Sequence, residues 1–157
     1  MKKIYLSLIL ISFLAIIVAC NEEPYNDEKT VNLQYLPNSW SLVKYEISTP
    51  SGSGTIVTTT QLDGAMHFVF NGDNTMSITD HDVVQANGIY NLYEADNTLE
   101  LVEYTFVDGV EPEGIASLLL PIVVDNRLLI EELTSEVLTV SMPYSSDTRF
   151  IAYFIRK

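Results

Sequence analysis

From Leu36 onward, short apolar or alternating runs are separated by clusters of Asn, Asp and Gly. The runs are rich in Val, Ile, Thr, Tyr and Phe, which are typical of strands, and the clusters between them are typical of turns. No stretch keeps a helical spacing of apolar residues over three turns. Prolines also interrupt the longer apolar windows, at Pro50, Pro112, Pro121 and Pro143. The pattern therefore predicts an all-β domain.

The runs predict a series of strands joined by tight turns. Their ranges are Trp40 to Ile47, Thr55 to Leu62, Met66 to Asn71, Thr75 to Thr79, Gly88 to Tyr93, Thr98 to Phe106, Leu118 to Val124, Arg127 to Leu133, Val137 to Met142 and Arg149 to Arg156. The turns at 71–74, 96–97 and 125–126 contain Asn, Asp or Gly, which tolerate a positive φ or bond to their own backbone. Sequential strands favour an up-and-down antiparallel β-barrel of about 8–10 strands, since closure removes exposed edges.

Alternation sorts the strand residues by face. Met66, Phe68 and Phe70 lie on one side of their strand, with His67 and Val69 on the other. The predicted inward-facing set is Met66, Phe68, Phe70, Met76 and Tyr90. The last strand is apolar on both sides, which is typical of a sandwich centre or of a barrel whose outside is partly covered.

The first twenty residues have a separate character. Lys2 and Lys3 precede an apolar run over residues 4–18, and Ile17-Val18-Ala19 leads into Cys20, the only cysteine. This layout resembles the signal peptide and lipobox of bacterial lipoproteins. The resemblance implies cleavage before Cys20 and acylation of that residue, with palmitate or a similar fatty acid, and hence a lipid anchor.

The alternatives are an ordinary secretory peptide and a transmembrane helix. An apolar run of about 15 residues is shorter than the roughly 20 that a spanning helix needs, which disfavours the second. We therefore expect a signal peptide over residues 1–19, a lipidated, acidic and flexible tether over 20–34, and one domain over 35–157. Glu22-Glu23 resembles an acidic export signal for the outer face of the outer membrane, although a solvated linker explains it equally well.

The chain is strongly acidic, with a formal net charge of −13 from 21 acidic and 8 basic residues. Loss of residues 1–19 removes Lys2 and Lys3 and makes the balance more negative. Such a surface repels phosphate backbones, and no Lys/Arg cluster offsets it, so nucleic-acid binding is excluded. The charge favours solubility, with basic partners as the alternative. With Cys20 committed to lipid, no disulfide stabilises the domain.

Several short motifs resemble the lipocalin-like domains of bacterial lipoproteins. They are the opening Leu36-Pro37-Asn38-Ser39-Trp40-Ser41-Leu42, the hairpin 66–75, the strand Asn87-Gly88-Ile89-Tyr90-Asn91-Leu92 and the closing segments 129–134, 137–140 and 154–157. Asn38 stands where that family has glycine. The resemblance covers about residues 35–157 and implies a barrel or half-open barrel with an apolar interior, closed at one end by Trp40. It implies no particular ligand, because one fold hosts many functions.

Candidate chemistry is sparse. Asp80-His81-Asp82 places a histidine between carboxylates, as a metal site or a tuned acid–base group requires. Consecutive residues of an extended chain point in opposite directions, however, so a solvated loop is the better interpretation. Glu131-Glu132 and the pair Glu111 and Glu113 are weaker candidates. The sequence has no motif of a hydrolase elbow, a metalloprotease helix, a phosphate loop or an EF-hand, so we expect no enzyme activity, metal or cofactor.

Two functions remain open. The first is binding of a small apolar or amphipathic ligand inside the barrel, by Trp40, Met66, Phe68, Phe70, Met76 and Tyr90. The second is a protein-interaction module, an enzyme inhibitor or an accessory subunit of an envelope complex, with a side-chain-filled barrel. Loops at 50–54 and 107–115 would rim the open end. In both cases the expected location is the cell envelope, at the periplasmic or surface-exposed face of the outer membrane.

Overall fold

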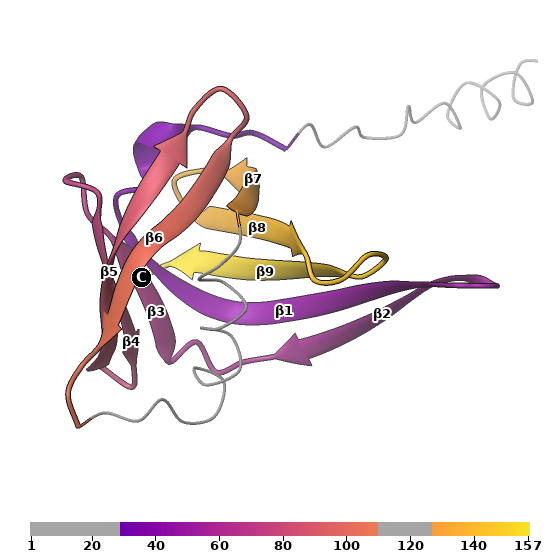
Figure 1. The fold of residues 1–157 in the computed structure, drawn as a ribbon, viewed down its shortest axis with the longest axis horizontal. Coiled ribbons are helices and arrows are strands. Elements are labelled where there is room, and N and C mark those ends of the chain that lie inside the picture. Colours follow the sequence, from indigo (N-terminus) through magenta and orange to yellow (C-terminus); the bar gives the residue numbers. More distant parts are fainter. Residues whose placement is uncertain (1–28, 110–126) are drawn as a thin grey trace, which may run out of the picture.

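The computed structural model describes residues 29–109 and 127–157 of the chain. One 3-10 helix, η1 (Leu33–Tyr35), precedes nine strands that make up most of the fold (Figure 1). The strands are β1 (Ser39–Ser51), β2 (Gly54–Gln61), β3 (Met66–Phe70), β4 (Thr75–Asp80), β5 (Val83–Tyr93), β6 (Thr98–Phe106), β7 (Arg127–Leu133), β8 (Val137–Pro143) and β9 (Arg149–Arg156). The described part is therefore all-β, as the pattern predicted.

All nine strands belong to one antiparallel sheet that closes into a ring. From β3 to β9 each strand pairs with the next, and β9 returns to pair with β1. β1 closes the ring because it pairs with β9 on one side and with β3 on the other. On the side of β3, the two halves of β1 have different partners. Residues Ser39–Ser41 pair with β3, whereas Lys44–Ser51 pair with β2. The ring consists of β1 and β3 to β9, and β2 lies outside it.

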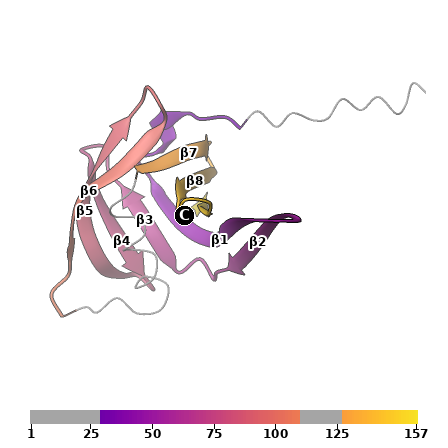
Figure 2. The same cartoon turned by 45° about the vertical axis from the view of Figure 1, so that its right-hand side comes forward.

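β2 and the second half of β1 form a hairpin whose end, beyond the last β1–β9 pair at Ser48, projects away from the ring, as Figures 1 and 2 show from two directions. We call this hairpin, residues 44–61, the arm. Ser51 pairs with Gly54, so the arm turns over Gly52 and Ser53 alone. The loop expected at 50–54 is thus a hairpin tip, and Pro50 belongs to β1. Proline fits there because β9 ends its pairing with β1 at Ser48, and among the described residues no ladder partner beyond it needs the missing N–H.

The strand ranges expected from the pattern agree closely with those observed for β6, β7 and β9. The main difference is β5, which begins at Val83 instead of Gly88. A glycine suggests a strand boundary, but Gly88 lies within β5, where a Cβ would stand 2.4 Å from the carbonyl oxygen of Glu103. Glycine is needed there for close backbone approach, not for a turn. The strand expected at 118–124, the turn at 125–126 and most of the rim loop at 107–115 lie outside the described residues.

The tight turns follow the expected chemistry. Asn74 and Asn97 have φ values of 67° and 53°, within the left-handed region that asparagine tolerates. The turn between β4 and β5 contains His81 and Asp82 with φ of 49° and 62°. Two consecutive positive values are those of a two-residue hairpin turn, which usually contains Asn or Gly. The sequence does not predict this hairpin, because His–Asp is an unusual composition for such a turn.

The core fills the inside of the ring. All five residues of the predicted inward-facing set are buried, with 2–5% of their surface exposed. Trp40, Leu42, Phe150 and Phe154 from the closing strands complete the core, together with side chains of β6, β7 and β8. In β9 the inner side chains are buried, while on the outer face Ile151 and Tyr153 are half-buried and Ile155 is exposed. The outside of β9 is therefore partly covered, as its apolar pattern predicted.

The chain before η1 runs along the ring instead of leaving it. Val31 bridges to Leu133 of β7, Asn32 donates its N–H to the Leu133 carbonyl at 2.9 Å, and the Leu133 N–H is donated to Thr30 at 2.8 Å. Residues 29–34, assigned to a flexible tether by their polarity, thus belong to the domain. Their polar pattern did not reveal the backbone pairing that holds them. Cys20 and the rest of residues 1–28 lie outside the described residues.

Among the described residues, no helix has the length and hydropathy needed to cross a bilayer.

Candidate functional site

The six residues predicted to contact a ligand lie together inside the ring. Phe70 packs edge-to-face on Tyr90 with centroids 5.2 Å apart, and Phe68 does the same with Phe154 at 5.3 Å. Such aromatic pairs add to the free energy gained from burial alone. The structure places these residues in the core, and their contact with a ligand stays a prediction.

Both polar groups of this aromatic cluster have partners within the protein. The Trp40 indole Nε1 donates to the Leu36 carbonyl at 3.0 Å, and the Tyr90 hydroxyl donates to the Asn71 carbonyl at 2.7 Å. Burial raises the pKa of Tyr90, with a smaller contribution from Asp73. The two groups therefore stabilise the ends of the core and leave no free polar atom directed at a ligand.

The space that remains inside the ring is a cavity of about 20 Å³. Its lining is apolar and consists of Leu42, Phe68, Phe70, Leu99, Leu101, Leu128, Leu138, Val140, Phe150, Ala152 and Phe154. The lining offers no polar partner to a water molecule, so a cavity of this kind stays dry. Side chains of the described residues fill the interior.

The Asp80-His81-Asp82 sequence forms an exposed turn in which the side chains diverge. His81 bonds to Asp80 through Nδ1 at 2.8 Å, whereas Asp82 pairs with the Lys157 ammonium at 2.9 Å. The hydrogen bond and the charge of Lys157 lower the pKa of Asp82. In the described ranges, no group of three or more His, Cys, Asp or Glu residues is arranged to hold a metal ion. Of the weaker acidic candidates, Glu131 and Glu132 lie on β7, and residues 111 and 113 lie outside the described residues.

The structure brings together one buried pair that the sequence pattern does not predict. Ser41 of β1 lies directly opposite His67 of β3, and Ser41 Oγ is 2.8 Å from His67 Nδ1. Burial is the main cause that lowers the pKa of His67, followed by the charge of Lys157, so the neutral imidazole is favoured. Each residue is only 8% exposed, which leaves the hydroxyl closed to a substrate. Finding this pair from sequence requires the register of β1 against β3, which alternation does not give.

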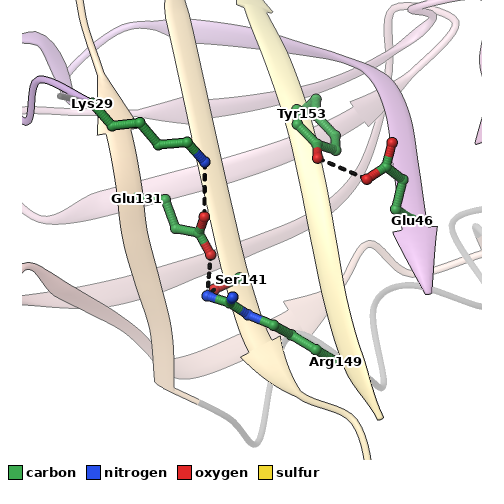
Figure 3. Close-up of polar contacts among 6 residues, drawn as sticks. All are labelled: Lys29, Glu46, Glu131, Ser141, Arg149 and Tyr153. Carbon is green, nitrogen blue, oxygen red and sulfur yellow. Dashed lines mark hydrogen bonds and ion pairs between the residues drawn. The ribbon is translucent and has the colours of Figure 1, made fainter. Parts of the chain in front are cut away.

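The outer face of β7, β8 and β9 carries an ion-pair cluster, shown in Figure 3. Glu131 accepts from Lys29 at 3.0 Å and from Arg149, and Arg149 also donates to Ser141 at 2.8 Å. Burial raises the pKa of Glu131, but hydrogen bonds from Ser141 and Lys29 and the charges of Arg149 and Lys29 outweigh it. The net effect is a lowered pKa. The cluster joins three adjacent strands to the segment before η1.

A second polar group joins β9 to β1. The Tyr153 hydroxyl donates to Glu46 at 2.8 Å, and Lys44 donates to Glu46 at 3.0 Å while lying 3.8 Å from the centroid of the Tyr153 ring. The hydrogen bonds from Tyr153 and then Lys44 lower the pKa of Glu46. Burial, with the hydrogen bond and charge of Glu46, raises the pKa of Tyr153 to about 12. These contacts cover the outside of the ring where β9 pairs with β1.

An open groove of about 420 Å³ lies beside the ion-pair cluster. It is lined by Leu129 and Met142 and by the loop between β8 and β9, with Arg127 and Arg149 at its sides. Arg127 is held in place by the Tyr93 ring at 4.3 Å and by Glu100 at 3.9 Å. Leu129 is 40% exposed there. The groove is thus an accessible surface with a small apolar floor and two basic residues in an acidic protein.

Comparisons with family models, with curated proteins and with solved structures found no match to this chain.

Proposed function

We propose that this chain is a lipid-anchored protein of the bacterial cell envelope whose ring is a rigid scaffold for contacts with another protein. The leader and Cys20 support the anchor, and the filled interior supports the scaffold. A cavity of about 20 Å³ is far below the several hundred cubic ångströms that ligand pockets occupy. In this proposal the protein acts either as an enzyme inhibitor or as an accessory subunit of an envelope complex.

The competing proposal is carriage of a small apolar or amphipathic ligand among the six interior aromatic and methionine residues. That function requires the interior side chains to separate, because the described residues leave a cavity of only about 20 Å³ where a ligand pocket has several hundred cubic ångströms. It also requires the ligand to replace existing aromatic contacts, such as those of Phe68 with Phe154. The filled ring therefore favours the scaffold.

Photo-cross-linking from the groove beside the ion-pair cluster tests the proposed contact with another protein. A photo-reactive residue replaces Leu129, which lies in the groove, and a matched variant carries it at Ile155, which is 48% exposed on the outer face of β9. Irradiation of intact cells is expected to attach one protein at residue 129 and none at residue 155. The measurement is a shifted band identified by mass spectrometry.

Native mass spectrometry of the full chain, extracted with detergent from its own envelope, separates the two proposals. The scaffold predicts a chain without a small-molecule adduct. A stoichiometric small-molecule mass, together with no cross-link at residue 129, would overturn the scaffold in favour of ligand carriage.

A further inference from the structure

β2 is a sheet edge without the usual protection. It pairs with β1 on one side only, and in the described part of the chain no strand covers its other side. Proteins normally shield such edges with charged residues, proline or a bulge. The eight residues Gly-Thr-Ile-Val-Thr-Thr-Thr-Gln contain none of these, although the chain carries 21 acidic residues. Ile56 and Val57 are 59% and 52% exposed.

The register of the arm identifies which backbone groups are free. The Leu62 N–H is donated to the Val43 carbonyl at 2.9 Å, so positions 43 and 62 form a hydrogen-bonded pair. Such pairs alternate along an antiparallel ladder. The N–H and C=O groups that point away from β1 therefore belong to Thr55, Val57, Thr59 and Gln61. They form a row of donors and acceptors along the outer side of β2.

We infer that two copies of this chain pair through β2, antiparallel, about a twofold axis at Thr58. In this register every outward-pointing residue faces another, so the full strand length is hydrogen-bonded. The cross-strand pairs are 55 with 61, 56 with 60, 57 with 59, and 58 with itself. All of them are neutral, and most are β-branched, the combination that stabilises cross-strand pairs.

The position of β2 puts the two rings on opposite sides of the proposed pair. β1 pairs with β9 as far as Ser48, which lies opposite Val57, so the ring borders β2 at residues 57–61 and the hairpin tip extends beyond it (Figure 1). In an antiparallel pair about Thr58, residues 57–61 of each copy face residues 55–59 of the other, so the two rings lie toward opposite ends of the shared strands. β2 contains no charged residue, so no like charges face each other across the pair.

Site-specific disulfides test the pairing and its register. The full chain carries Cys20→Ser, which leaves an introduced thiol as the only one, so the result does not depend on the proposed anchor or scaffold. Thr58→Cys is expected to form a disulfide dimer under copper–phenanthroline, because residues that face each other at a non-hydrogen-bonded pair are about 4.5 Å apart. Thr55→Cys is the matched control, since residue 55 would lie about 20 Å from its copy, six positions away along the strand.

The expected result on a non-reducing gel is a dimer band at least about tenfold stronger for Thr58→Cys than for Thr55→Cys, given the steep distance limit of a disulfide. Equal bands, or none in either variant, would overturn the inference. Charge substitutions give a second readout. Thr58→Lys and Thr58→Glu, carrying different tags, are each expected to lose self-capture and to capture each other when mixed. Failure of the mixture to restore capture would overturn the twofold pairing at residue 58.

Discussion

At the scale of single residues, Glu131 links stability to pH. Its pKa is lower in the folded state than the ordinary value of 4.5, because Ser141, Lys29 and Arg149 outweigh the effect of burial. Ionised Glu131 therefore stabilises the fold above pH 4.5, and this contribution disappears as the pH falls through the folded-state pKa. Charged hydrogen bonds of this kind contribute about 1–2 kcal/mol when their partners are half-exposed.

We predict that Glu131→Gln lowers the free energy of unfolding by about 1–2 kcal/mol at pH 7 and by less at pH 3, because part of the contribution of the carboxylate is lost once the pH is below the ordinary pKa of 4.5. Urea unfolding, followed by Trp40 fluorescence between pH 3 and pH 7, measures both values. Glu94→Gln, in the exposed turn between β5 and β6, is the control and should leave the stability unchanged. An equal loss at both pH values would show that the effect is not electrostatic.

At the scale of the elements, β5 depends on Gly88. The backbones of β5 and β6 approach so closely there that a Cβ would meet the Glu103 carbonyl oxygen at 2.4 Å, a contact with backbone that no side-chain rotation relieves. We predict that Gly88→Ala lowers the free energy of unfolding by about 1–3 kcal/mol, the usual cost of an overpacked contact. Gly72→Ala has open space around the new Cβ and is the matched control. Similar denaturation midpoints for the two variants would contradict this prediction.

The same elements show what sequence can and cannot predict here. Alternation located the strands and the inward side chains, because burial on one face imposes a period of two. It did not show that β1 changes partner after Ser41, that β2 leaves the ring, or that Ser41 meets His67. Those features depend on register between strands distant in sequence, which a local pattern does not encode. For the same reason the sequence does not predict the ion-pair cluster around Glu131, although it offers Glu131-Glu132 as a candidate.

At the scale of the whole molecule, the proposed anchor makes a direct prediction. We expect the wild-type chain to incorporate labelled palmitate and to lose residues 1–19, and Cys20→Ser to lose the label. Two or more acyl chains hold a domain on a membrane for long periods, because each buried methylene contributes about 0.8 kcal/mol and a single chain binds only reversibly. Radiolabelling and intact-protein mass spectrometry measure both changes. Asn26→Ser is the control, and a labelled Cys20→Ser chain would contradict the anchor.

The closure of the ring is uneven, and this unevenness affects how the domain moves. Within residues 29–109 and 127–157, β1 meets β3 only over residues 39–41, and β6 meets β7 only over residues 98–100. Each junction has three paired residues, whereas every other pair of neighbouring strands in the described part of the chain has four or more. Either junction is therefore the place where local opening of the ring breaks the fewest backbone hydrogen bonds. Amide protons at the two junctions would then exchange with solvent sooner than those in the middle of either sheet.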